Sequence, residues 1–328
     1  MKSAFLDILC CPHCRGGLRL NATERDGAEI IAGALDCAAC GVSYPVRCGI
    51  PRFQIEPLEG EKARTVENFG KQWRQFNWLD PAYEQQFLDW IRPVTREDFR
   101  GKVMLDAGCG KGRHLVWAHK FGAETVVGLD LSDAVEEAYM HTREMPNVHV
   151  AQADIYSPPV KPVFDYIYSL GVLHHLPDPE GGFRVLPTLL RQGGSISVWV
   201  YGRENNGWII WLVNPLRRGV TSHLNPLGLR VVSWAITAFA LWPMLRLIYG
   251  PLGETAKKLP YGEYLSYISK FSFRDVRAIV YDHLTPPTAH YIRREEIEKW
   301  FETMRLSGIQ IAHHNRNSWR GFARRETH

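Results

Sequence analysis

The sequence predicts an α/β protein in which a mostly parallel, Rossmann-like sheet follows a small N-terminal zinc ribbon and carries a helical lid. Two Cys-x-x-Cys pairs lie within the first 40 residues, which indicates a metal-bound module. A glycine-rich turn follows an apolar strand near residue 105, and further apolar strands alternate with helical segments after it. A long apolar segment then interrupts this series, and we expect it to be a helical insertion.

Composition and charge limit the class of protein. A hydrophobic content of 45% with 23% charged residues excludes a mostly disordered chain, and a net charge of +4 is too small to indicate a nucleic-acid binder. The first residues contain no apolar core of signal-peptide length, so we expect a cytoplasmic protein. The longest apolar run, residues 231–245, contains Pro243 and is shorter than the ~20 residues of a membrane-spanning helix.

The N-terminal cysteines form the first candidate site. Cys11 and Cys14 make one pair and Cys37 and Cys40 the other, with residues 15–36 between them. Each pair can lie on a tight turn whose amides approach the thiolates, so the four predict a closed, structural zinc site. Disulfides or unrelated buried cysteines are the alternatives, and a cytoplasmic protein favours metal. Three cysteines stay outside this site: Cys10, Cys48 and Cys109.

Residues 5–53 resemble the small zinc ribbon that activates several methyltransferases, either as a separate protein or fused to the enzyme. The resemblance rests on the two cysteine pairs and on Gly17, Tyr44-Pro45-Val46 and Gly49-Ile50-Pro51. It implies a structural module that contacts its enzyme through apolar surface. After a charged linker, residues 65–98 carry aromatic side chains at helical spacing, and we expect one helical stretch packed on the core. Within it, residues 69–73 are an alternative lid over a cofactor.

The glycine-rich turn indicates a nucleoside site. An apolar strand over residues 103–107 leads into glycines at 108, 110 and 112, and the next strand ends in Asp130. This layout binds a nucleoside at the first crossover of a parallel sheet. A dinucleotide site would need a third glycine at position 113, which is Arg113, so the spacing instead suits a nucleoside that carries an amino acid.

Residues 100–200, with the run GVLHHLPDP at 171–179, resemble the class I S-adenosylmethionine-dependent methyltransferases of the small-molecule, type 11-like branch. The resemblance implies a methyltransferase with a seven-stranded sheet and S-adenosylmethionine as cofactor. It implies that Asp130 accepts hydrogen bonds from the ribose and that Asp154 contacts the adenine, although Asp154 could instead cap a helix or stabilise a turn. The cofactor-binding residues expected in this way are Asp106, Gly108, Gly110, Gly112, Asp130, Leu131, Asp154, Ile155, Ser169 and Leu170.

The acceptor side carries weaker signals. Methyl transfer needs an oriented acceptor and, for some acceptors, a base. His174 and His175 follow the fourth strand and are candidate bases, with capping or packing as the alternative. His283 and His290 are further candidate bases much later in the chain. By the resemblance, a loop over residues 281–291 crosses above the cofactor, and Asp282 and His290 are its substrate-side residues. Hydrogen bonding within the loop is the alternative for both.

Residues 201–272 form an insertion rich in Trp and Leu. Its segment 229–249 places Arg230, Ser233 and Thr237 on one stripe of an otherwise apolar helix, which indicates a buried helix or one in a membrane interface. As a lid, the insertion favours a small-molecule or lipid-linked acceptor that is methylated on O, N or C. We also expect peripheral membrane contact through 229–249 and no nucleic-acid partner. A self-packing helical cap is the alternative.

Two other functions remain open. One is an RNA or protein methyltransferase that uses the ribbon for recognition, and the other is a cofactor-binding partner protein without turnover. We expect a zinc ribbon at 1–55, a linker and N-terminal helices at 56–98, a cofactor-binding core at 99–200, the lid at 201–272 and completion of the core at 273–328.

Overall fold

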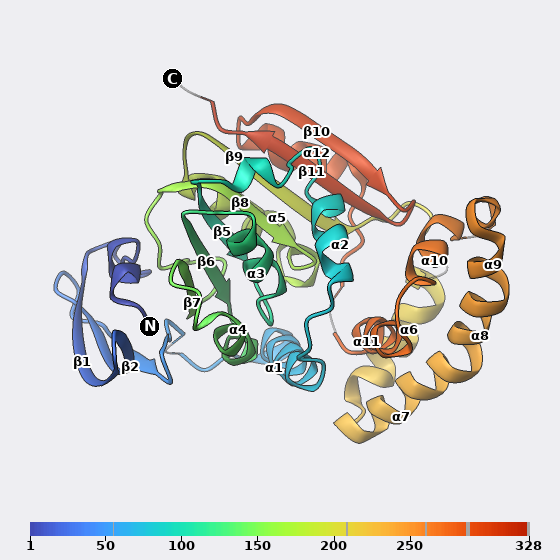
Figure 1. The fold of residues 1–328 in the computed structure, drawn as a ribbon, viewed down its shortest axis with the longest axis horizontal. Helices are drawn as coiled ribbons and strands as arrows, with labels where there is room; N and C mark the ends of the chain where they lie inside the picture. Colours follow the sequence, from blue (N-terminus) through green and yellow to red (C-terminus); the bar gives the residue numbers. More distant parts are fainter. Residues whose placement is uncertain (55, 208, 260, 287–288, 327–328) are drawn as a thin grey trace.

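The computed structural model describes residues 1–328 except 55, 208, 260, 287–288 and 327–328. A central α/β body lies between a small N-terminal sheet on one side and a layer of helices from the insertion on the other (Figure 1). The N-terminal sheet is antiparallel, in the order β1-β2-β3-β4, and follows a short 3₁₀ helix at Ser3–Asp7. Its strands are β1 (Leu18–Asp26), β2 (Glu29–Cys37), β3 (Ser43–Arg47) and β4 (Ile50–Pro51).

The central sheet has seven strands in the order β10-β11-β9-β8-β5-β6-β7. They are β5 (Val103–Ala107), β6 (Thr125–Asp130), β7 (Val148–Gln152), β8 (Phe164–Leu170), β9 (Leu190–Tyr201), β10 (Ser307–His314) and β11 (Ser318–Arg324). All neighbours from β7 to β9 are parallel, and β11 runs antiparallel to both of its neighbours. The predicted fold class, a mostly parallel seven-stranded methyltransferase sheet with an N-terminal ribbon, is confirmed.

Alternating side chains of the strands divide the core into two faces. Met104 and Val126 point into a cluster with α2 (Ala82–Trp90), α3 (Arg113–Lys120) and α4 (Ala134–Thr142). Leu105 and Val127 point into the other cluster, with α5 (Pro179–Val185), α12 (Arg294–Thr303) and the ribbon. The central sheet is therefore buried on both faces, as its continuous apolar strands require.

The helical stretch expected over residues 65–98 is not continuous. It consists of α1 (Gly60–Gln75), α2 and a 3₁₀ turn at Glu97–Phe99. The first helix ends because Phe76 has a non-helical backbone (φ −115°, ψ 54°), and Pro81 then caps the start of α2, where a missing N–H interrupts no helical hydrogen bond. Buried Lys111 binds the freed backbone, because its Nζ donates to the carbonyls of Phe76 at 2.6 Å and Trp78 at 2.8 Å.

The ribbon shares one hydrophobic core with the central domain. Phe5 and Leu9 of the ribbon belong to the same buried cluster as Leu105 and Val160. The Phe5 ring stacks on His149 of β7, with 4.9 Å between ring centroids. Main-chain hydrogen bonds also cross the junction: Cys10 N donates to Pro159 O, Lys161 N to Ile8 O and Phe53 N to Gln152 O. Apolar contact, implied by the resemblance, is thus accompanied by backbone pairing.

The insertion forms a helical layer beside the sheet (Figure 1). Its helices are α6 (Asn214–Gly219), α7 (Pro226–Ile236), α8 (Trp242–Met244), α9 (Gly250–Leu252) and α10 (Gly262–Ile268), with π-helical segments at Ile209–Val213, Thr237–Leu241 and Leu245–Tyr249. Helix α11 (Phe273–Leu284) follows and packs against α7.

In the segment 229–249 of the insertion, two polar side chains face inward and large apolar side chains face solvent. Ser233 and Thr237 are fully buried, and their hydroxyls donate to the carbonyls of Arg230 and Ser233. Phe239 and Leu247, in contrast, are 76% and 77% exposed. Of the two alternatives for this segment, a fully buried helix is therefore wrong, because Arg230 and much of the apolar surface are exposed while Ser233 and Thr237 pack inward.

Candidate active site

The four predicted zinc ligands come together. The Sγ atoms of Cys11, Cys14, Cys37 and Cys40 all lie within 4.8 Å of one another, at the turns before β1 and after β2. The backbone closes both knuckles, since Arg15 N donates to Cys11 O and Gly41 N donates to Cys37 O. Four thiolates without a further ligand position fit structural zinc. Cys10, Cys48 and Cys109 are not part of this cluster.

The glycine-rich turn after β5 takes backbone conformations that other residues avoid. Gly108, Gly110 and Gly112 have φ angles of +92°, +51° and +81°. A Cβ on Gly108 would lie 2.3 Å from Cγ2 of Val172, and one on Gly112 would lie 3.0 Å from Cα of Ala138 in α4. Gly108 therefore keeps space at the site, whereas Gly112 allows α3 and α4 to pack closely.

Asp130 ends β6 at the carboxyl edge of the sheet, as predicted. Its Oδ1 accepts from the amide and hydroxyl of Ser132 at 2.8 and 2.7 Å, and its Oδ2 accepts from Gly110 N at 2.9 Å. Burial raises the pKa of this carboxyl, while the three hydrogen bonds oppose that rise. A carboxylate has about four acceptor positions, so Asp130 retains one for a ribose hydroxyl.

Asp154 lies at the next strand end but is already paired. Its Oδ2 forms an ion pair with Lys62 of α1, and its Oδ1 accepts from Tyr156 N at 3.1 Å. The bond to Tyr156 is the turn role considered as the alternative for this residue. An adenine amino group at Asp154 would therefore have to share the carboxylate with Lys62.

A cavity of about 920 Å³ joins these residues. Helix α1 covers it with Phe69, Gln72 and Trp73, so the segment 69–73 does lie over the site. Of the expected cofactor-binding residues, the cavity is lined by Gly108, Gly110, Asp130, Leu131, Asp154, Ile155 and Leu170.

Three expected cofactor residues do not line this cavity: Asp106, Gly112 and Ser169. Asp106 is fully buried, and among the described residues neither carboxylate oxygen has a hydrogen bond; His114 Nδ1 lies 3.8 Å from Oδ2. Burial raises its pKa well above the usual range. Ser169 is turned into the core, where its hydroxyl donates to Ala107 O at 2.8 Å.

Asp282 reaches the acceptor end of the cavity from a different element than expected. It lies in the last turns of α11 rather than in a loop, because the helix continues to Leu284. Its carboxylate accepts from Gln72 Nε2 at 2.7 Å and from Tyr201 Oη at 3.3 Å. Three elements, α1, β9 and α11, thus converge on this carboxylate. Pro287 and Thr288 of the predicted loop lie outside the described residues.

The two histidines after β8 lie at the same end. His175 lines the cavity and contacts Phe69, with 4.9 Å between ring centroids. His174 is fully buried behind it, 4.2 Å from the His175 ring and 3.9 Å from the Tyr201 ring. Burial and the neighbouring positive charges lower the pKa of His174 well below its usual value, so this ring is neutral.

His290 is placed differently from the other predicted site residues. Its side chain lines a second, smaller hollow with Asn214 and Tyr291 instead of the main cavity. Its contribution to the site is through the backbone, because His290 N donates to His174 O at 2.8 Å.

Sequence reasoning named His283 only as a further candidate base and assigned no role to Arg217 or Tyr291. His283 and Tyr291 line the cavity and lie 5.7 and 5.8 Å from the Tyr201 ring. Arg217 is 1% exposed and donates to Asn214 Oδ1 at 2.7 Å. His283 and Tyr291 lie within the segment 281–291 singled out from the sequence, whereas Arg217 comes from the insertion, so no local pattern could have grouped Arg217 with them.

The cavity fits a nucleoside that carries an amino acid. It has the volume of a small-molecule site and a carboxylate at Asp130 for a ribose. The apolar side chains of Leu131, Ile155 and Leu170 offer surface for a base. The residues present are therefore compatible with S-adenosylmethionine.

Two family models match the chain. Residues 105–198 match a methyltransferase domain, and residues 2–49 match the Trm112p-like proteins. These matches agree with the glycine turn and with the cysteine cluster. They support the predicted cofactors, S-adenosylmethionine and structural zinc.

Curated relatives share the central part of the chain. A tRNA U34 carboxymethyltransferase of Pseudoalteromonas translucida is 34% identical over 197 residues, which is 52% of this chain and 60% of the relative. The enzyme of the same name from Colwellia psychrerythraea is 31% identical over 183 residues, 49% of this chain and 55% of the relative. The match thus spans little more than half the length of these relatives.

Solved structures show distant likeness. Magnesium protoporphyrin IX methyltransferase of Synechocystis with bound S-adenosylmethionine has a TM-score of 0.47 at 14% identity, over 83% of this chain and 100% of that chain. A complex of the Trm112 methyltransferase activator of Haloferax volcanii with a methyltransferase has a TM-score of 0.45 at 14% identity, with the same coverage. At these scores the superpositions add nothing to the topology described above.

Proposed function

Because the chain joins a class I S-adenosylmethionine-dependent methyltransferase domain to a Trm112p-like zinc ribbon, we propose that it modifies RNA, with tRNA as the first acceptor to test. The observation that carries this proposal is the sequence identity of 34% over 197 residues to a tRNA U34 carboxymethyltransferase. The acceptor nucleoside is then a uridine.

The proposal corrects the expectation of a small-molecule or lipid-linked acceptor without nucleic acid. That expectation is contradicted by the relatives, whose name places them on tRNA. It rested on an apolar lid, and the insertion does line the cavity with Ile236, Leu241 and Met244, but an apolar lining does not identify the acceptor. The same cavity also presents the polar groups of Tyr201 and Asp282.

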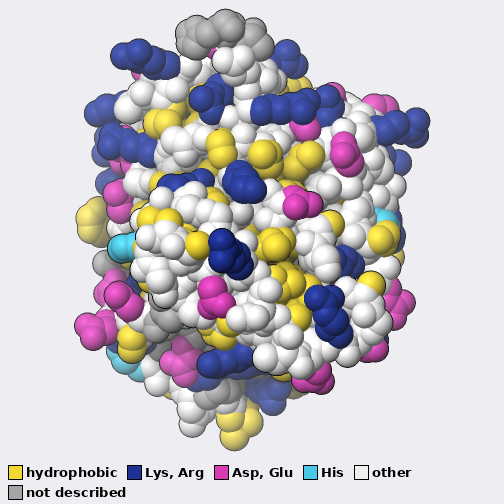
Figure 2. All heavy atoms as spheres, turned by 90° about the vertical axis from the view of Figure 1, so that its left-hand side faces the viewer, with side chains coloured by type: hydrophobic (Ala, Val, Ile, Leu, Met, Phe, Trp, Pro, Cys, Tyr) yellow, Lys and Arg dark blue, Asp and Glu magenta, His cyan; other side chains and the backbone are white. Residues whose placement is uncertain are grey.

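The acceptor end suits a nucleic-acid base. Tyr201, His283 and Tyr291 offer aromatic faces around one point of the cavity, and RNA-modifying sites commonly stack an extruded base between such rings. Lys and Arg side chains are also spread over the ribbon side of the molecule, where they could meet phosphates (Figure 2).

The predicted catalytic residues take distinct proposed roles. S-adenosylmethionine, when bound, supplies an electrophilic methyl group. His175 faces the cavity and is positioned to take a proton from the acceptor. His174 supports it from behind, Asp282 holds Gln72 and Tyr201 in place around the acceptor, and His290 fixes the His174 backbone. Because His174 is neutral, it adds no charge that would repel a sulfonium.

The experiment is transfer of label from methyl-labelled S-adenosylmethionine by the purified full chain. The acceptors are total tRNA, ribosomal RNA and a deproteinised small-molecule extract, and Asp130→Ala is the inactive control. We expect nuclease-sensitive label in tRNA that the control does not produce. The mass of the modified nucleoside shows whether one methyl group, the group that this cofactor supplies, has been added. Label confined to the small-molecule fraction, or to protein, would contradict the proposal.

A cytoplasmic location, expected from the sequence, agrees with relatives that act on tRNA. The finer location, at a membrane surface, is a separate proposal that rests on the insertion. Within the described residues one helix, Leu227–Lys258, is long and apolar enough to cross a membrane, and 17% of its most apolar window is buried. No acidic residue occurs between Glu204 and Glu254, which favours anionic lipid beside exposed apolar side chains.

A further inference from the structure

We propose that Arg52, which joins the zinc ribbon to the central sheet, is a positioning residue for the cofactor's ribose loop, so that zinc in the ribbon raises cofactor affinity. The ribose loop is defined as residues 130–134. The proposal rests on the proposed function only in that S-adenosylmethionine is the cofactor.

The Arg52 guanidinium binds core residues on both sides of that loop. Its Nη1 donates to Gln152 Oε1 at 2.9 Å, and its Nη2 donates to Glu136 Oε1 at 3.0 Å. Nη1 also lies 3.7 Å from Asp133 Oδ1. The Arg52 side chain is 13% exposed, whereas Asp133 and Glu136 are 52% and 46% exposed, so the guanidinium is sheltered but its carboxylate partners are in contact with water.

Gln152 carries the effect of Arg52 into the loop. Its oxygen accepts from Arg52, which leaves its Nε2 to donate to Leu131 O at 3.1 Å and Asp133 Oδ1 at 3.3 Å. Leu131 follows Asp130, the predicted ribose ligand. Without Arg52 the amide of Gln152 could rotate by half a turn and present an acceptor to the Leu131 carbonyl, which would repel it.

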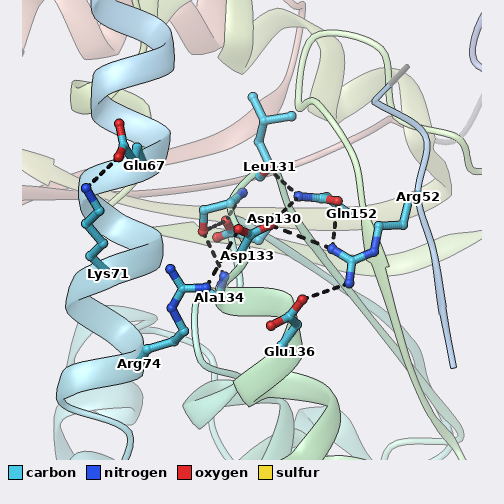
Figure 3. A network of polar contacts seen from close by, with 11 residues as sticks. Arg52, Glu67, Lys71, Arg74, Asp130, Leu131, Asp133, Ala134, Glu136 and Gln152 are labelled. Atoms are coloured by element: carbon cyan, nitrogen blue, oxygen red, sulfur yellow. Dashed lines mark hydrogen bonds and ion pairs between the residues drawn. The ribbon is translucent and has the colours of Figure 1, made fainter. Parts of the chain in front are cut away.

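A second cation completes the cradle around the loop. Arg74 of α1 places its Nη1 3.8 Å from Asp133 Oδ2, on the side opposite Arg52 (Figure 3). Asp130, Asp133 and Glu136 gather negative charge at this turn, and Arg52 is the cation that contacts two of the three. Removing it leaves Asp133 and Glu136 with less compensation, and we expect the loop to relax.

The ribbon determines where Arg52 lies. Arg52 N donates to Pro45 O of β3 at 2.9 Å, and the next amide, Phe53 N, donates to Gln152 O of β7 at 2.8 Å. Tyr44, which precedes Pro45, has its hydroxyl 3.2 Å from Sγ of the zinc ligand Cys11. A short path of direct contacts therefore runs from the metal site through β3 to Arg52 and the ribose loop.

The test measures cofactor binding by the full, zinc-loaded chain without any acceptor. Isothermal titration with S-adenosylhomocysteine gives the Kd, and mass spectrometry of the metal gives zinc content. We expect Arg52→Met to weaken S-adenosylhomocysteine binding about tenfold, because it removes the charge-assisted hydrogen bonds of Arg52. Its zinc content should be unchanged. Arg52→Lys keeps the charge but not the paired geometry of the guanidinium, so its Kd should lie between those of the natural chain and Arg52→Met. Arg47→Met, an exposed arginine of β3, is the matched control and should bind normally.

Two further arms separate positioning from general damage. Gln152→Glu keeps an acceptor for Arg52 but removes the donor to Leu131, and it should weaken binding as Arg52→Met does. Removing zinc with a chelator should weaken binding in the natural chain and add little in Arg52→Met, because the connection is already broken. Normal affinity in zinc-loaded Arg52→Met, or an equal effect of chelation in both proteins, would overturn the proposal. Failure of RNA to accept a methyl group would leave these binding results unaffected.

Discussion

His149 should make the stability of the protein depend on pH through the junction between ribbon and core. The ring lies on β7, is 5% exposed and stacks on Phe5 with an interplanar angle of 6°. Burial, followed by the positive charge of Lys2, lowers the pKa of His149 to about 4 from an ordinary 6.5. The folded protein therefore holds this ring neutral where the unfolded chain would protonate it.

The sign and size follow from proton linkage. Below pH 6.5 the unfolded chain binds a proton that the folded chain does not, so the free energy of unfolding falls as the pH falls toward 4. At pH 5 the loss relative to pH 8 is about 2 kcal/mol, and below pH 4 it reaches about 3.4 kcal/mol, at ~1.36 kcal/mol per pKa unit. This is a sizeable share of the stability of a typical domain.

Urea unfolding at pH 8 and pH 5 measures this contribution. The variant His149→Gln keeps a planar side chain but does not titrate, so it should lose about 2 kcal/mol less than the natural chain between the two pH values. Both proteins keep all other titrating groups, including the zinc ligands, and zinc content is checked at each pH. An equal loss in the two proteins would refute the assignment of this pH dependence to His149.

Two further predictions concern the glycine turn and the insertion. Gly108→Ala should weaken S-adenosylhomocysteine binding about tenfold in a titration, because φ is +92° and the new Cβ would lie 2.3 Å from Cγ2 of Val172. At Gly17 a new Cβ would have no atom within 4 Å, so the control variant Gly17→Ala should bind normally. If the insertion contacts a membrane, the natural chain should co-sediment with anionic vesicles and the double variant Phe239→Glu/Leu247→Glu should not. Met140 is 60% exposed on α4, so the control variant Met140→Glu should behave like the natural chain. Absence of vesicle binding by the natural chain would contradict the proposal.

Features that depend on local spacing could be predicted from the sequence. The cysteine pairs formed the cluster that Cys11, Cys14, Cys37 and Cys40 predict, because two tight knuckles need only short-range geometry. The glycine turn and Asp130 also lie where the strand pattern places them, since a residue that ends a parallel strand must emerge at the carboxyl edge of the sheet. The fold class follows from the same periodicity.

Features that depend on packing between distant segments needed the tertiary structure. Asp106 and Ser169 belong to the right strands but face the core. His290 lines a different hollow from Asp282, although the two residues are only eight positions apart in the sequence. The sequence also could not show that Ser233 and Thr237 of the insertion face inward, because an amphipathic pattern shows that two faces differ but not which one is covered.

The sequence by itself thus determined that a zinc ribbon precedes a methyltransferase sheet, because each is specified by contacts within a few dozen residues. Only the tertiary structure decided that the two share one core and that Arg52 links them, since its partners Glu136 and Gln152 lie 84 and 100 residues further along the chain. Contacts over such separations depend on how the whole chain packs, and no periodicity in the sequence encodes them.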